Sequence, residues 1–117
     1  MRRFRQQMGQ QAELAQMEQE ARNMMHQGVE YGYIVCRKGK VITHGRESTG
    51  DPTHVTIDTR CPAGARPIAL FHSHPNTGNI QPSDVDLREA RRHGIPNVCV
   101  GIPEDGRVKC YKVPGVA

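Results

Sequence analysis

Residues 68–75 read Ile-Ala-Leu-Phe-His-Ser-His-Pro, an apolar run that ends in two histidines separated by one residue. The apolar run predicts a buried strand, and side chains two positions apart in a strand point to the same face. His72 and His74 therefore share one face near the end of the strand, where two imidazoles can converge on a single zinc ion. The pair on its own is a weak signal for a metal, because strand histidines whose nitrogens are satisfied by ordinary hydrogen bonds give the same pattern.

A helix start follows at residues 82–86, which read Pro-Ser-Asp-Val-Asp. The pattern predicts a helix from Ser83 to His93, closed by a glycine. Asp86 in its first turn can complete a set of two histidines and one carboxylate, which leaves a fourth position on zinc open for water. The same Ser-x-x-Asp pattern resembles a capping box. The two roles are compatible, because Ser83 can cap the helix and still offer its hydroxyl to a substrate.

The rest of the chain supplies strands on both sides of this unit. Apolar residues at spacings of three and four predict an amphipathic helix over roughly residues 5–26, ended by Gly28. Short apolar runs between turn signals predict strands over residues 31–36, 41–44, 54–58, 67–71, 97–102 and 108–113. This order predicts an α/β (α+β) domain with a mixed and mostly antiparallel sheet. The sheet is flanked by the N-terminal helix and by the helix that follows the strand ending in His72-Ser73-His74, here called the HxH strand.

Length and composition indicate one domain. At 117 residues the chain can bury a single core, and we divide it into the N-terminal amphipathic helix, 1–27, and a catalytic core over 28–113. The basic start is not followed by an apolar segment, and no run is long enough to span a bilayer, so we expect a soluble cytoplasmic protein with no membrane partner. The net charge is +4, but no aromatic residues are interleaved with the arginines, so nucleic acid is not expected as a partner.

The four cysteines show no CxxC pair, and without an export signal we expect reduced thiols. Cys36, Cys99 and Cys110 fall in strand-like runs and are predicted to be small buried side chains. Cys61 lies in the loop before the HxH strand, where an approach to the metal as a fourth ligand or a redox switch is an alternative.

The two motifs together resemble a known family. His72-Ser73-His74-Pro75, followed by the segment 82–86, resembles the signature of the JAMM/MPN (JAB-type) zinc metalloproteases. That family also uses a glutamate near the start of the first strand, and Glu30 stands at that place. The resemblance covers roughly residues 28 to 113 and implies a cytidine-deaminase-like JAMM architecture. The spacer between the second histidine and the serine is eight residues rather than the usual seven, and the length matches a short prokaryotic-type member.

The resemblance implies a role for each residue of the signature. His72, His74 and Asp86 would hold one Zn²⁺ ion, Glu30 would be the general acid/base, and Ser83 would stabilise the oxyanion. Zinc lowers the pKa of a bound water to about 7, and a nearby carboxylate can take up that proton and return it to the leaving amine. A hydroxyl beside the metal can donate to the oxyanion. Glu47 is a less well placed alternative base.

The sequence therefore leads to the hypothesis of a zinc-dependent metallopeptidase or isopeptidase that hydrolyses a peptide or isopeptide bond. Its expected substrate is a protein or peptide, with ubiquitin-like and sulfur-carrier proteins among the candidates. The alternative is a non-catalytic JAMM-fold binding or scaffold module. A zinc nucleoside deaminase is a third hypothesis, but its H-x-E and P-C-x-x-C signature is not found in the sequence.

Overall fold

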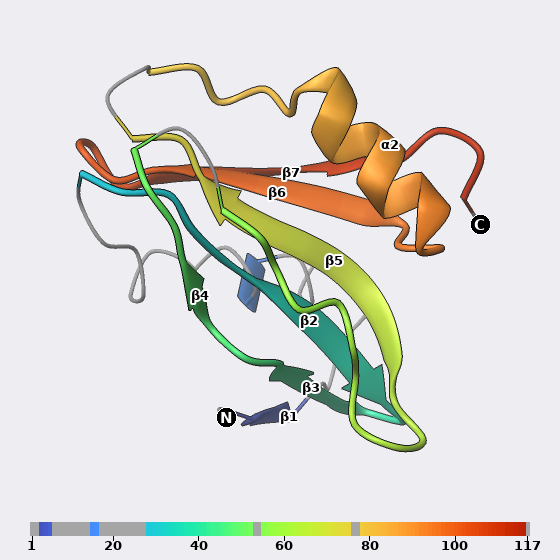
Figure 1. Ribbon diagram of the computed structural model, residues 1–117. Coiled ribbons are helices and arrows are strands. Elements are labelled where there is room, and N and C mark those ends of the chain that lie inside the picture. The colour runs from blue at the N-terminus through green and yellow to red at the C-terminus, as the bar shows by residue number, and fades with distance from the viewer. Residues whose placement is uncertain (1–2, 6–14, 17–27, 53–54, 76–77, 117) are drawn as a thin grey trace.

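The computed structural model describes residues 3–5, 15–16, 28–52, 55–75 and 78–116, and Figure 1 shows how their elements are arranged. The described strands form one mixed sheet in the order β1-β3-β2-β5-β6-β7, with β4 paired to β2. The strands are β1 (Arg3–Arg5), β2 (Tyr31–Lys38), β3 (Val41–His44), β4 (Ser48–Thr49), β5 (Arg66–Ser73), β6 (Asn97–Ile102) and β7 (Arg107–Lys112). The helix α2 (Asp84–Arg92) connects β5 to β6.

Among the strands that the structure describes, only β5 and β6 are parallel, and every other pair is antiparallel. A parallel pair needs a crossover connection, which α2 provides. Figure 1 shows α2 lying over one face of the sheet. The prediction of an α+β domain with a mixed, mostly antiparallel sheet and a helix after the HxH strand is confirmed.

The two faces of the sheet carry separate apolar clusters, and this explains why β5 has no polar alternation. Six consecutive residues of β5, from Ile68 to Ser73, are buried. A strand covered on both faces is expected to read as a continuous apolar run. The cluster on the α2 side contains Ile34, Cys36, Leu70, Ala90, Ile95, Val98, Val100 and Val113. The cluster on the opposite face contains Tyr31, Tyr33, Val35, Ile42, Ile68, Ala69, Phe71, Cys99 and Val108.

Two of the predicted elements differ from the structure or fall outside it. The helix expected over 1–27 lies largely outside the described residues; within it, Ala15 and Gln16 are helical, whereas Arg3–Arg5 form β1. Arg3–Arg5 form a strand rather than a helix because β1 pairs with β3 and supplies hydrogen-bond partners to its otherwise open edge. The strand predicted over 54–58 is wrong for residues 55–58, which have no regular secondary structure, and residue 54 is outside the described part. Ile57 is instead partly buried and packs against the apolar cluster on the α2 side of the sheet.

The prediction of reduced thiols is wrong, since the four cysteines form two disulfides. Cys36 in β2 is bonded to Cys61, and Cys99 is bonded to Cys110. The register of β6 and β7 places Cys99 directly opposite Cys110, a proximity that sequence spacing does not reveal. The bond to Cys36 also leaves Cys61 without a thiol for a metal, so its suggested role as a fourth ligand is not supported. No helix among the described residues has the length and hydrophobicity needed to cross a membrane.

Gly32 is required where β2 passes β5. A Cβ atom at this position would overlap the carbonyl oxygen of Phe71 and would lie 2.5 Å from Cδ1 of Ile57. Backbone on β5 cannot move away without disturbing the ladder, so we expect Gly32→Ala to lower the free energy of unfolding by about 1–3 kcal/mol. Urea denaturation followed by circular dichroism measures this change. A variant as stable as the wild type would show that β2 and β5 can separate here at little cost.

Candidate metal centre

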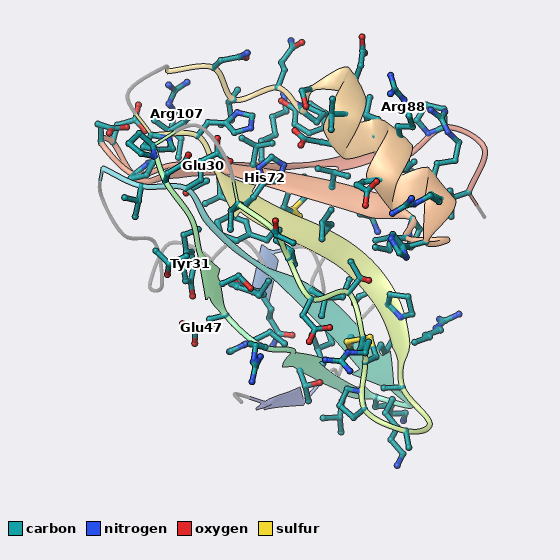
Figure 2. The ribbon with its side chains drawn as sticks, viewed as in Figure 1. Glu30, Tyr31, Glu47, His72, Arg88 and Arg107 are labelled. Carbon is teal, nitrogen blue, oxygen red and sulfur yellow. A yellow bond between two sulfur atoms is a disulfide. The ribbon has the colours of Figure 1, made fainter. Side chains whose placement is uncertain are left out.

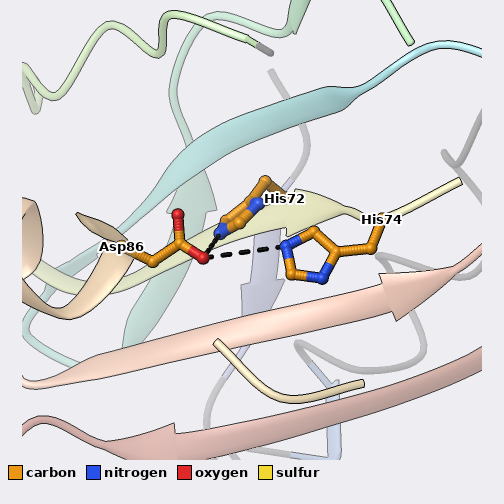
Figure 3. A group of neighbouring side chains, drawn as sticks. All are labelled: His72, His74 and Asp86. Atoms are coloured by element: carbon orange, nitrogen blue, oxygen red, sulfur yellow. Dashed lines mark ion pairs between the residues drawn. The ribbon is translucent and has the colours of Figure 1, made fainter. Parts of the chain in front are cut away.

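His72, His74 and Asp86 meet at the end of β5 where the chain turns toward α2. His72 is the second-last residue of β5 and His74 follows the strand, while Asp86 lies in the first turn of α2. His72 Nε2 is 3.0 Å and His74 Nε2 is 3.6 Å from the same oxygen, Oδ2 of Asp86 (Figure 3). One ligand atom from each residue lies within 4.8 Å of the others, so the three side chains could hold a metal ion.

The donors fit a zinc ion in chemistry as well as in spacing. Two imidazole nitrogens and one carboxylate oxygen are ligands that zinc prefers. His72 Nε2 is buried, and among the described residues no group makes an aligned hydrogen bond with it, despite its 3.0 Å approach to Asp86. Buried polar atoms are nearly always satisfied, and an exception needs an explanation. A cation shared by His72, His74 and Asp86 would satisfy this nitrogen.

Asp86 is held in place by the start of its own helix. Its Oδ2 accepts a hydrogen bond of 2.8 Å from the backbone N–H of Ser83, and its backbone N–H donates to Ser83 Oγ over 3.1 Å. These reciprocal bonds are a capping box with Ser83 as the N-cap residue. The capping role and a position beside the histidines therefore coexist in the same two residues.

Glu30 lies beside the histidines because of the register between β2 and β5. Gly32 is paired with His72, and continuing this antiparallel register by two residues sets Glu30 opposite His74. Ser73, between the two histidines, is fully buried, and its Oγ accepts a hydrogen bond of 3.0 Å from the backbone N–H of Tyr31. This bond ties the start of β2 to the end of β5. This role of Ser73 was not predicted from the sequence.

The backbone of Glu30 is also fixed from the other side. Its N–H donates to the carbonyl of Asp51 and its C=O accepts from the N–H of Gly50, both over 2.8 Å. Figure 2 shows Glu30 and His72 at the same end of the sheet, with Glu47 farther along the molecule.

All five residues singled out in the sequence line one pocket of about 600 Å³. Glu30, His72, His74, Ser83 and Asp86 are joined in its wall by Val55, Thr56, Ile57, Thr59, Leu70, Val85 and Glu89. The alternative base Glu47 does not line this pocket; its Oε1 instead accepts a hydrogen bond of 2.7 Å from the Tyr31 hydroxyl. Of the two glutamates, Glu30 is therefore the one that lies in the pocket with His72, His74 and Asp86.

The titration of the site reflects this crowding. Burial on its own would raise the carboxyl pKa of Asp86, but the contacts with His72 and His74 outweigh burial and hold that pKa well below its usual range. Burial would likewise lower the pKa of His74, whereas its contacts with Asp86 and the Asn79 carbonyl, and the nearby charge of Glu30, raise it overall. Asp86 and His74 therefore attract each other as an ion pair, and a metal ion bound between them would have to displace the ring proton.

The two opposite pKa shifts predict how the stability of the metal-free protein depends on pH. The raised pKa of His74 stabilises the fold below pH 6.5, and this contribution is lost as the pH rises through the raised pKa. The lowered pKa of Asp86 stabilises the fold above pH 3.8, and this contribution is lost as the pH falls through the lowered pKa. The contribution of the pair is thus fullest between pH 3.8 and 6.5. We expect the difference in urea midpoint between wild type and Asp86→Asn, both in chelator, to be largest in that window. A difference that keeps growing to alkaline pH would contradict the ion-pair description.

Comparison with known proteins adds information on the fold. No protein-family model matches the sequence, and no curated protein is significantly similar to it. Among solved structures, a JAB1/MPN domain protein from Archaeoglobus fulgidus superposes with a TM-score of 0.50 at 20% sequence identity, over 88% of this chain and 86% of that one. The fold is that of an MPN domain. At this identity the likeness concerns the MPN fold alone.

Proposed function

We propose that this chain is a zinc-dependent hydrolase of peptide or isopeptide bonds, with the zinc ion held by His72, His74 and Asp86. The observation that carries the proposal is the convergence of three ligand atoms within 4.8 Å in a pocket that Glu30 and Ser83 also line. Three protein ligands of this kind, with a further position open to solvent, are the composition of a catalytic rather than a structural zinc site.

Glu30 supplies the proton transfer in this proposal. Zinc bound at the site would lower the pKa of a coordinated water and polarise the carbonyl of the substrate. The carboxylate of Glu30 takes a proton from the attacking water and later gives it to the nitrogen of the leaving amine. The C–N bond breaks as that nitrogen is protonated, so the products are a carboxylic acid and an amine. Glu30 is suited to this because its backbone is fixed on both sides and the residue lines the pocket.

Ser83 supplies a hydrogen-bond donor. A serine hydroxyl has one proton to donate and two lone pairs. Ser83 Oγ uses a lone pair to accept from the N–H of Asp86, which leaves the hydroxyl proton for a substrate group in the pocket. Donation to the oxygen that becomes negative during attack lowers the barrier, because that charge develops only in the transition state.

The substrate in this proposal is a protein or peptide, ubiquitin-like and sulfur-carrier proteins included. The pocket wall combines the apolar residues Val55, Ile57 and Val85 with polar residues that include Thr56 and Glu89. Val85 is 62% exposed, so a substrate chain can bury it on binding. An apolar wall with a few polar groups suits a peptide side chain next to the bond to be cleaved.

Metal dependence tests the proposal against the alternative of a non-catalytic MPN-fold module. Peptide and isopeptide-linked substrates are incubated with zinc-loaded protein, with chelator-treated protein, and with treated protein after zinc is restored. We expect cleavage only in the first and third samples. Cleavage that persists without metal would contradict the zinc mechanism, and binding of the substrates without cleavage by zinc-loaded protein would favour the binding module.

A further inference from the structure

A second layer of contacts lies behind His74, in the loop that leads into α2. The Nδ1 atom of His74 is 2.9 Å from the carbonyl oxygen of Asn79. A carbonyl can only accept, so this contact requires that the proton of the ring be on Nδ1. With the proton there, the lone pair is on Nε2, the nitrogen that faces Asp86 and the pocket. The Asn79 carbonyl thus selects the form of His74 that can bind a metal.

Asp86 works against this selection when no metal is bound. Its Oδ2 is 3.6 Å from His74 Nε2 and attracts the ring proton toward that nitrogen. The contact of Nδ1 with the Asn79 carbonyl, at 2.9 Å, is shorter and has normal hydrogen-bond length, so it holds the ring proton on Nδ1. This holds only while the loop carbonyl keeps its position. The position of a backbone carbonyl in an exposed loop therefore decides which nitrogen of His74 is available.

Strand β7 fixes that loop on both sides of Asn79. The hydroxyl of Tyr111 donates to the carbonyl of Ile80 over 3.0 Å, and a guanidinium nitrogen of Arg107 is 3.4 Å from the carbonyl of Gly78. Arg107 is itself oriented by Asp105, whose Oδ2 is 2.7 Å from Nε of Arg107. The two contacts therefore hold the residues directly before and after Asn79, and both come from β7, none of whose residues line the pocket.

We propose that Tyr111 is a positioning residue for His74: through the Ile80 carbonyl it holds the Asn79 carbonyl against Nδ1, and so keeps the proton of the neutral His74 ring on Nδ1 and leaves Nε2 directed at the metal position. Arg107 assists at Gly78 through a longer contact. The position of the proton on the His74 ring is inferred from these contacts alone. The effect of that position on metal binding rests on the proposed zinc function.

The test of positioning uses metal-free protein labelled with nitrogen-15, studied at alkaline pH where the ring of His74 is neutral. The chemical shifts of the two ring nitrogens report which one carries the proton. In the wild type we expect the proton mainly on Nδ1. In Tyr111→Phe we expect the ratio of the Nδ1–H to the Nε2–H form to fall about fivefold, the factor that corresponds to one ordinary hydrogen bond.

Tyr31→Phe is the matched control, because it deletes a tyrosine hydroxyl whose 2.7 Å bond ends on Glu47 rather than on the loop. We expect its tautomer ratio to equal that of the wild type. An unchanged ratio in Tyr111→Phe, or an equal change in both variants, would overturn the proposal. Should Tyr111→Phe not fold, Arg107→Gln is measured in the same way, and an unchanged ratio there has the same meaning.

Zinc affinity gives a second readout, measured by competition with a chromophoric chelator. We expect Tyr111→Phe to bind zinc about tenfold more weakly than the wild type, at the lower end of the effect of removing a group that orients a ligand. Wild-type affinity in Tyr111→Phe would overturn the positioning role and leave the proposed function standing. A tautomer shift in a protein that takes up no zinc would overturn the proposed function and leave the positioning role standing.

Discussion

Glu30→Gln is expected to lower the rate of peptide or isopeptide hydrolysis by a factor of about 10²–10⁴ while the protein still binds one zinc ion per chain. The substitution keeps the size of the side chain but removes its ability to accept a proton from water. Glu30 is not among the three ligands that converge on the metal position, so the metal should remain. Initial rates with saturating substrate, together with zinc content of the same sample, measure both parts.

Glu47→Gln is the matched control for this prediction. Glu47 directly precedes β4, is hydrogen-bonded to the Tyr31 hydroxyl and does not line the pocket. We expect Glu47→Gln to retain the wild-type rate. If Glu30→Gln were fully active, or if Glu47→Gln lost activity to the same extent, the role assigned to Glu30 would be wrong.

Asp86→Ala and Asp86→Asn should separate the two roles of Asp86. Both variants remove the charged ligand and should lose zinc and activity. Asn retains an oxygen that can accept from the N–H of Ser83, so it should keep the helix cap, whereas Ala loses half of the capping box. We therefore expect Asp86→Ala to be less stable than Asp86→Asn by about 1 kcal/mol in the metal-free state. Zinc analysis and urea denaturation in chelator measure the two effects.

The neighbouring carboxylate provides the control for Asp86. Asp84 lies in the same first turn of α2 and is exposed, but it is not one of the three converging ligands. Asp84→Ala should keep zinc and activity. Retention of zinc by Asp86→Asn at wild-type affinity would show that the carboxylate charge is not needed for binding. Retention of zinc by Asp86→Ala would remove Asp86 from the ligand set.

The local features of the site could be read from the sequence because each depends on a few consecutive residues. The apolar run before His72 predicts β5, alternation sets His74 on the same face, and the Ser83 to Asp86 spacing predicts a helix start. The placement of Glu30 came from a family resemblance rather than from periodicity. Its nearness to His74 follows from the β2–β5 register, which no short segment encodes.

Features that depend on tertiary packing could not be predicted in this way. The Cys99–Cys110 disulfide requires the β6–β7 register, and the role of Tyr111 requires the loop to lie against β7. Residues 55–58 resemble a strand because apolar and polar side chains alternate there. Ile57 satisfies that alternation by packing against the sheet without joining its ladder.

The zinc content of the purified protein tests the central claim most directly. Wild type, His74→Ala and Asp86→Asn are loaded with zinc, passed over a weak chelating resin, and assayed for metal and protein at matched concentration. We expect one zinc ion per chain in the wild type and almost none in either folded variant. A folded wild type that takes up no zinc, or variants that hold as much as the wild type, would contradict it.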